Sequence, residues 1–206
     1  IDQDLNGFDS VWGSSAFDPL SASENTYLTN YLSSGGGLFL TGERPCCEVL
    51  NASIQTLLNS VVIAGGIQVG GLGDMGSSML INAQAIGNLA STPNTITTWA
   101  PSASGGIGGV TGNNVFAYNN SGVTAAAWDM SDLVGNSGRI VLMMDVNWHS
   151  GPDSNDMAIY ENIENFLDGA TNNSGPSPVA VPEPSTLAIF GLALVGLASR
   201  RFKKQA

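Results

Sequence analysis

The amino-acid sequence predicts an α/β domain with a parallel β-sheet, and three observations support this. Residues 38–41 and 139–146 are continuous apolar runs, the kind that lies buried on both faces of a parallel sheet. Helical patterns at 51–58 and 156–167 follow these runs, and alternation of strands and helices is typical of parallel α/β sheets. The chain has 206 residues, of which 43% are hydrophobic and 11% charged, so it can bury a sizeable core.

The N-terminal half of this domain is predicted to begin with a short strand and a capped helix. Residues 8–13 (FDSVWG) are typical of a strand. In the helix at 21–32, Ser21 can cap the N-terminus, and Glu24 three residues later completes a capping box. The elements expected next are a strand at 38–41, a loop at 42–47, a helix at 51–58 and a strand at 61–64.

The C-terminal half is predicted to hold a hairpin, a buried strand and a closing helix. Residues 65–112 are rich in Gly, Ser and Asn and show few clear periods, so we expect mostly loops there. Residues 115–118 and 123–128 are predicted to pair as a hairpin. The strand at 139–146 is the clearest buried strand, and the helix at 156–167 has one apolar face.

Charge divides the chain into an acidic body and a basic end. Residues 1–180 hold 16 of the 17 Asp and Glu residues but only two basic residues, Arg44 and Arg139. The formal net charge of the whole chain is −11. An acidic body repels phosphate backbones, so we expect no nucleic acid among its partners.

The C-terminal tail carries an apolar run followed by basic residues. Residues 187–198 contain no charge, and with their flanks they make a helix of about 16 residues, or roughly 24 Å. A hydrocarbon core is about 30 Å thick, and basic side chains after the run can snorkel to recover part of the difference. We therefore predict a transmembrane helix at 185–199 with the C-terminus in the cytoplasm. The other interpretation is a buried core helix with a solvated basic end.

The order of pieces in this tail resembles the PEP-CTERM sorting signal of Gram-negative bacteria. The residues that carry the resemblance are Pro182, Glu183 and Pro184, then the apolar span, then Arg200, Arg201, Lys203 and Lys204. The resemblance implies export through the Sec machinery, recognition by an exosortase, removal of the tail and delivery to the cell envelope or the exterior. It also implies a domain at 1–168, a flexible linker at 169–181 and a sorting signal at 182–206. An extracellular polysaccharide is a further partner that such a location implies.

An exported protein needs an N-terminal secretory signal, which this sequence does not contain. The chain opens at Ile1 without a Met, on a polar stretch. We therefore expect a signal peptide, and the first strand–helix unit of the domain, to precede Ile1.

Two segments of the body resemble class I glutamine amidotransferase-like domains, including their non-catalytic relatives. Residues 20–43 (LSASENTYLTNYLSSGGGLFLTGE) resemble the stretch that leads into the elbow strand of that family. Residues 138–167 (GRIVLMMDVNWHSGPDSNDMAIYENIENFL) resemble its closing strand and final helix. The resemblance implies a three-layer parallel sheet of glutamine amidotransferase-like or flavodoxin-like type, truncated here at its N-terminus.

Active members of that family use a Cys at a sharp strand-to-helix turn, followed by a His and an acid further on. This chain holds Cys46, Cys47 and a single His, His149. The cysteines come several residues late, and Pro45 interrupts the turn. A Cys–His pair is therefore one alternative, and the other is a loop with two unrelated thiols that form a strained vicinal disulfide in an oxidising envelope.

Carboxylates at the ends of the two buried strands are the other candidate catalytic groups. Glu43 and Asp145 each end a buried strand, so both could face one cleft beside His149. Paired carboxylates suit glycoside hydrolysis. These three residues are the candidate site of an exported hydrolase or carbohydrate-active enzyme.

The loop 145–156 reads DVNWHSGPDSND and offers oxygen ligands for a metal ion. Asp145, Asp153 and Asp156 supply carboxylates of the type that Ca²⁺ prefers, although the spacing is not that of an EF-hand. The alternative is that Asp153 and Asn155 form turns and cap the last helix.

Two functions from different classes follow from these observations. The favoured hypothesis is a non-catalytic exported protein of the cell surface or extracellular matrix, sorted and processed through its tail. The alternative is the exported hydrolase with its site at the C-terminal ends of the strands.

Overall fold

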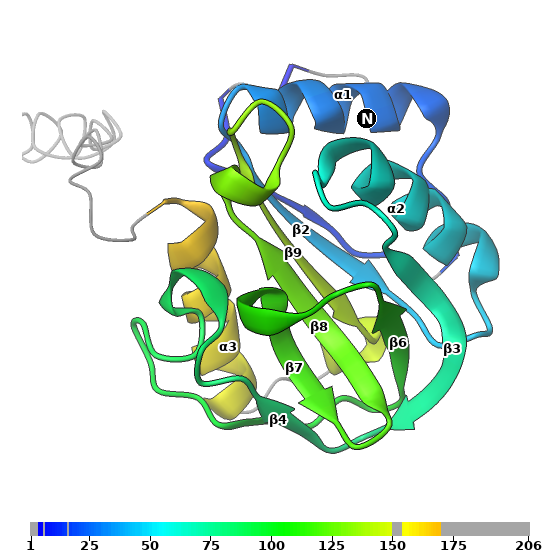
Figure 1. Cartoon of the computed structure of the whole chain (residues 1–206), viewed down its shortest axis with the longest axis vertical. Coiled ribbons are helices and arrows are strands. Elements are labelled where there is room, and N and C mark those ends of the chain that lie inside the picture. Colours follow the sequence, from blue (N-terminus) through cyan, green and yellow to red (C-terminus); the bar gives the residue numbers. More distant parts are fainter. Residues whose placement is uncertain (1–3, 6, 16, 150–153, 170–206) are drawn as a thin grey trace, which may run out of the picture. The chain divides into compact units, whose positions relative to one another are not determined.

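A computed structural model describes residues 4–5, 7–15, 17–149 and 154–169. Within this part of the chain the fold is a mixed α/β domain (Figure 1). Its strands and α-helices in chain order are β1 (Ser10–Gly13), α1 (Ala22–Ser33), β2 (Gly37–Gly42), α2 (Glu48–Val61), β3 (Gln68–Gly76), β4 (Met79–Ile81), β5 (Thr98–Trp99), β6 (Ser104–Gly108), β7 (Val115–Asn119), β8 (Gly122–Trp128), β9 (Arg139–Met144) and α3 (Ser154–Leu167).

Helices cover both faces of the sheet and divide the core in two. The first cluster of buried side chains joins α1 and α2 to one face of β2 and β9, and the second joins α3 to the opposite face. Alternate residues of β2 show the division, because Leu38 and Leu40 belong to the first cluster and Phe39 to the second. The described body therefore has three layers, with helices on both faces of the sheet.

The sheet itself is mixed and curled, which corrects the expectation of a parallel sheet. The strand order is β1-β2-β9-β8-β7-β4-β5, with β3 paired to β6 and β6 also paired to β8. Among the strand pairs of the described residues, only β1–β2 and β2–β9 are parallel, whereas β8 is antiparallel to β9. The reason is connectivity: β7 and β8 form a tight hairpin, and a short connection at 129–138 returns the chain beside β8 without a crossover helix.

The helices with clear local signals form where the sequence predicts them. Ser21 is the N-cap of α1, and the reciprocal bonds of the capping box with Glu24 are both present. Leu28, Tyr31 and Leu32 are the buried residues of α1. Helix α2 begins at Glu48, three residues before the predicted start at Asn51.

The glycine-rich middle of the chain forms strands that the sequence analysis missed. β3 and β6 pair with each other although their sequences are QVGGLGDMG and SGGIG. A Cβ at Gly106 would lie 2.4 Å from Met75 and 2.9 Å from Leu72, so glycine allows these strands and their neighbours to pack closely. Conversely, the strand expected at 61–64 is wrong, because Val61 ends α2 and only Val62 makes an isolated bridge, to Leu133.

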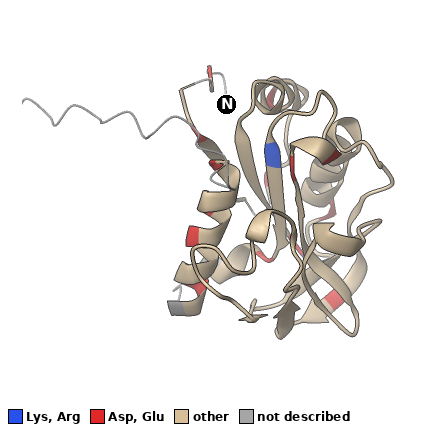
Figure 2. Cartoon of the chain, turned by 60° about the vertical axis from the view of Figure 1, so that its left-hand side comes forward, with Lys and Arg blue, Asp and Glu red and all other residues tan. Residues whose placement is uncertain are grey.

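Acidic residues are scattered over the described body, and basic residues are very few (Figure 2). Within the described residues, no helix is long and apolar enough to cross a bilayer. Three predicted features lie outside the described residues: the transmembrane helix at 185–199, the signal at 182–206, and nearly all of the linker at 169–181.

Candidate functional site

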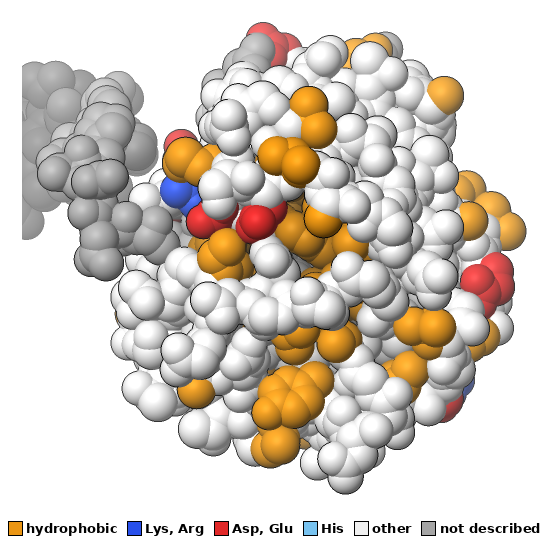
Figure 3. All heavy atoms as spheres, in the orientation of Figure 1, with side chains coloured by type: hydrophobic (Ala, Val, Ile, Leu, Met, Phe, Trp, Pro, Cys, Tyr) orange, Lys and Arg blue, Asp and Glu red, His pale blue; other side chains and the backbone are white. Residues whose placement is uncertain are grey.

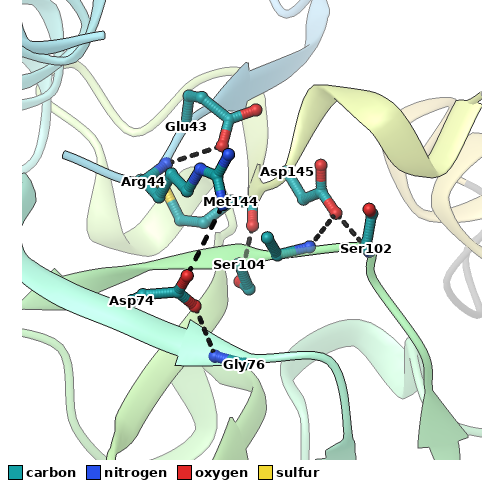
Figure 4. A network of polar contacts seen from close by, with 9 residues as sticks. Glu43, Arg44, Asp74, Gly76, Ser102, Ser104, Met144 and Asp145 are labelled. Carbon is teal, nitrogen blue, oxygen red and sulfur yellow. Dashed lines mark hydrogen bonds and ion pairs between the residues drawn. The ribbon is translucent and has the colours of Figure 1, made fainter. Parts of the chain in front are cut away.

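The C-terminal ends of two neighbouring parallel strands bring two predicted site residues together. The register of β2 and β9 places Gly42 opposite Met144. Glu43 directly follows β2, and Asp145 directly follows β9. Both residues therefore lie at this edge of the sheet (Figure 4). Open α/β sheets place their sites at this edge.

The turn that carries Glu43 is held by an asparagine of α2. Asn51 accepts a hydrogen bond from the backbone N–H of Glu43 at 3.0 Å, and its amide group donates to the carbonyl of Glu43 at 2.8 Å. Asn51 is fully buried, in the second turn of α2. Gly70 has a φ of +90°, and a Cβ there would lie 2.2 Å from the Asn51 amide nitrogen, so glycine leaves space for this clamp.

The carboxylate of Glu43 points back into the protein. It is 3% exposed, and its two oxygens accept from the backbone N–H groups of Arg44 at 2.8 Å and Val146 at 3.4 Å. Burial raises the pKa of Glu43, and the nearby negative charge of Asp145 raises it further. The protonated form of Glu43 therefore persists to a higher pH than it does for an ordinary glutamate.

Asp145 is fully buried and bound by backbone donors. One carboxylate oxygen accepts from Asn147 at 2.7 Å, and the other accepts from Ser102 and from Ala103, the latter at 2.9 Å. These three hydrogen bonds offset the cost of burying a carboxylate. Asp145 thus fixes the segment before β6 against the end of β9.

The same segment contacts the main chain of both neighbouring strand ends. The Ser104 hydroxyl donates to the carbonyl of Met144 (Figure 4). A Cβ at Gly105 would lie 2.7 Å from the carbonyl oxygen of Glu43 and 2.9 Å from the Cα of Arg44. β6 therefore covers the strand ends closely.

An ion pair lies at the outer side of this network. Nη1 of Arg44 lies 3.6 Å from Oδ2 of Asp74, and the two side chains are 48% and 50% exposed. Asp74 also accepts from the backbone N–H of Gly76 at 2.7 Å. An exposed pair of this kind contributes little to stability, because water and salt screen the two charges.

The other predicted site residues are only partly described. His149 ends a short 3₁₀ turn after Asp145, η4 (Val146–His149), but its side chain lies outside what the structure describes. Asp153 also lies outside the described residues, and Asp156 is a half-buried residue in the first turn of α3. Within the described residues, no three His, Cys, Asp or Glu side chains are placed to hold a metal ion. The calcium site therefore stays a prediction.

A hollow lies at the opposite end of the sheet. Its volume is about 240 Å³, and its lining includes Val62, Ile67, Val110, Trp128 and Asp132. Figure 3 shows apolar side chains on its floor. The volume is below the roughly 300–1,000 Å³ of ordinary small-molecule pockets, so we do not assign a ligand to it.

Several residues of the network were missed by the sequence analysis. Asn51, Ser102 and Ser104 hold the strand ends through contacts with residues distant in sequence. A polar residue on the buried side of α2 was the available signal for Asn51. Ser102 and Ser104 stand in a Ser- and Gly-rich stretch, where nothing in the sequence distinguishes them from loop residues.

Two solved structures share the fold of the described body. The mmIFT52 N-terminal domain matches with a TM-score of 0.57 and 14% identity over 80% of this chain and 79% of that one. The cytoplasmic protein STM3548 from Salmonella typhimurium matches with a TM-score of 0.50 and 15% identity over 79% of this chain and 73% of that one. At these identities the likeness concerns the fold alone.

The tail matches a known sorting signal. Residues 180–204 match the PEP-CTERM protein-sorting motif. The match includes the Pro-Glu-Pro triplet, the apolar run and the basic residues up to Lys204. It supports an exported, envelope-associated protein that is processed by an exosortase. No curated protein matches the chain.

Proposed function

We propose that this chain is an exported bacterial protein of the cell surface or extracellular matrix, with a non-catalytic body of glutamine amidotransferase-like type. The observation that carries the proposal is the PEP-CTERM motif at 180–204. In this proposal the Sec machinery exports the chain, the helix at 185–199 holds it in the inner membrane as a single span, and an exosortase then removes the tail.

The distribution of charge supports this orientation of the tail. Arg200, Arg201, Lys203 and Lys204 follow the apolar run directly, and basic residues next to a span favour the cytoplasmic side. The acidic body then lies across the membrane, followed by the polar linker that separates it from the processing site. Extracellular polysaccharide is the partner that we propose for the released protein.

The state of the strand ends supports a body without catalysis. Glu43 is 3% exposed and Asp145 is fully buried, and both carboxylates are bound by backbone N–H groups. A substrate that used these oxygens would have to replace the backbone donors that now bind them. Burial, more than any other cause, raises the pKa of Cys47 to about 12, so its reactive thiolate is scarce at neutral pH.

Processing of the tail tests the proposal directly. The chain, with a Sec signal supplied, is expressed in a Gram-negative host that has an exosortase, and in the same host without it. We expect a released form whose peptides stop before Phe202, as measured by mass spectrometry, and retention in the membrane without the exosortase. Peptides containing Lys203 in the released form would contradict the proposal.

Matched variants separate the signal from the linker. Changing Pro182, Glu183 and Pro184 together to Ala should leave the protein in the membrane. Changing Pro176 and Pro178 to Ala alters prolines of the linker outside the matched residues, so release should continue. Equal release of both variants would show that the exosortase does not recognise the Pro-Glu-Pro triplet.

A hydrolase is the second candidate function, because the register of β2 and β9 brings Glu43 beside Asp145. Two carboxylates in different environments are what acid–base catalysis of glycoside hydrolysis needs. Glu43, with its raised pKa, would be the acid, and His149 would assist from the following turn. Hydrolysis of a glycoside by the purified chain, lost in Glu43→Gln, would favour this candidate over the non-catalytic body.

A further inference from the structure

Two adjacent cysteines occupy the turn between β2 and α2, and their surroundings differ. Cys46 is exposed, whereas Cys47 is 6% exposed and is the N-cap residue of α2. Both cysteines are free. A reagent in solution can therefore reach the sulfur of Cys46, whereas burial shields the sulfur of Cys47 from it.

The two thiols contact each other and a cation. The interaction with Cys46 is the largest cause that raises the pKa of the Arg44 guanidinium. After burial, the interaction with Cys46 also raises the pKa of Cys47. The backbone reinforces this arrangement, because the N–H of Cys46 donates to the carbonyl of Arg44 at 2.7 Å. The exposed sulfur of Cys46 thus has a positive charge and a second, buried sulfur among its neighbours.

We propose that Cys46 and Cys47 form a thiol–disulfide exchange pair, in which the exposed Cys46 reacts first with a disulfide-bearing molecule and the buried Cys47 then closes a vicinal disulfide. The pair is distinct from the carboxylates of Glu43 and Asp145. Its chemistry does not depend on the export proposal, although an exported protein meets disulfides in the envelope.

The exchange consists of two balanced steps. The Cys46 thiolate attacks one sulfur of an external disulfide, which forms a mixed disulfide and releases one thiolate that takes up a proton. The Cys47 thiolate then attacks the Cys46 sulfur, which forms the bond between the two cysteines and releases the second external thiol. The chain loses two protons and two electrons, and the external disulfide gains both.

The two steps differ in rate because the two sulfurs differ in environment. Burial raises the pKa of Cys47 to about 12, and its hydrogen bond to Cys46 raises it too. Exchange requires a thiolate, and the thiolate fraction of such a group increases about tenfold for each pH unit near neutrality. Ring closure should therefore be the slow step, and the mixed disulfide on Cys46 should accumulate first.

The closed ring is expected to be easily reduced. Consecutive Cα atoms are about 3.8 Å apart, whereas disulfides usually join Cα atoms about 4.4–6.8 Å apart. The resulting strain makes the bond more reducible than an ordinary structural disulfide. The pair thus responds to the external ratio of thiol to disulfide instead of acting as a permanent cross-link.

Glutathione disulfide serves as the probe, applied to the reduced 206-residue chain in detergent. Mass spectrometry should first detect one glutathionyl group on Cys46. That species should then lose glutathione and leave a chain two hydrogens lighter, with the bond between Cys46 and Cys47. The rate of this second step should increase about tenfold per pH unit between about pH 7 and pH 9.

Single variants separate the roles of the two sulfurs. Cys47→Ser should form the mixed disulfide at the wild-type rate and keep it, whereas Cys46→Ser should not react at Cys47 while the chain is folded. Decay of the mixed disulfide in Cys47→Ser as fast as in the wild type would overturn the proposal. Modification of Cys47 in folded Cys46→Ser, or disulfide-linked dimers as the only product, would also overturn it.

Discussion

Asn51 binds the backbone of Glu43 through both ends of its side-chain amide. The carbonyl oxygen of Asn51 accepts from the Glu43 N–H at 3.0 Å, and the amide nitrogen donates to the Glu43 carbonyl at 2.8 Å. Helix α2 thereby fixes the turn that follows β2. Both candidate chemistries of this chain, the carboxylates and the cysteines, lie on or beside that turn.

Replacing Asn51 tests this clamp. Asn51→Ala removes two buried hydrogen bonds and leaves both backbone groups without partners, so we expect a loss of about 2–4 kcal/mol in the free energy of unfolding. Urea denaturation measures it. Asn113 is exposed, and Asn113→Ala should change stability by less than about 0.5 kcal/mol. Equal effects of the two variants would mean that the turn is held by other contacts.

The approach of β6 to the turn predicts that Gly105 cannot carry a side chain. A Cβ there would lie 2.7 Å from the carbonyl oxygen of Glu43, so we expect Gly105→Ala to destabilise the body by about 1–3 kcal/mol. At Gly71 of β3 a Cβ would meet nothing within 4 Å. Gly71→Ala should therefore be within about 0.5 kcal/mol of wild type. Equal melting temperatures of Gly105→Ala and Gly71→Ala would contradict the close packing of β6 against the turn.

Burial of Glu43 predicts a pH dependence of stability. Because the folded-state pKa of Glu43 is raised above the ordinary value of 4.5, the folded chain binds more protons than the unfolded chain between these two pKa values. Stability therefore decreases as pH increases through that window, and it is unaffected by this group below it. Glu43→Gln cannot titrate, so wild type should lose stability relative to the variant as pH increases from the ordinary value of 4.5 to the raised folded-state pKa.

Urea denaturation of both proteins across that range measures the difference. Glu43→Gln also replaces a hydrogen-bond acceptor, so its stability at a single pH does not report on titration. The informative quantity is how the difference in stability between wild type and variant changes with pH. A difference that stays constant across the range would mean that Glu43 titrates alike in the folded and unfolded chains.

The calcium prediction for Asp145, Asp153 and Asp156 is testable without disturbing the core. A site occupied at a hundred times its dissociation constant stabilises the folded state by about 2.7 kcal/mol, which raises the melting temperature by several degrees. EDTA should then lower the melting temperature of the chain, and Asp153→Asn should remove the difference. Asp153→Asn is preferable to Asp145→Asn, because Asp145 also holds Asn147 and Ala103. Identical melting curves with calcium and with EDTA would exclude the site.

Local sequence signals were sufficient to predict those features that depend on a few adjacent residues. The capping box of Ser21 and Glu24 lies within one helical turn, and it predicts the start of α1 correctly. The apolar run that became β9 is buried on both faces in the folded chain, as its composition indicates. The sorting signal at 180–204 is a linear motif as well, so its residues in order are enough to recognise it.

The strand directions and the arrangement of the candidate site depend instead on contacts between segments that are distant in sequence. The direction of β8 relative to β9 depends on the length of the connection between them, and apolar composition does not encode it. The glycines of β6 resemble loop residues in sequence, yet Gly105 is needed because the backbone of Arg44 lies against it. Sequence alone placed Glu43 and Asp145 at strand ends, but only the parallel register of β2 and β9 makes them neighbours. Whether a side chain is a site or a structural support depends on such packing, because burial and hydrogen bonding are properties of the folded chain.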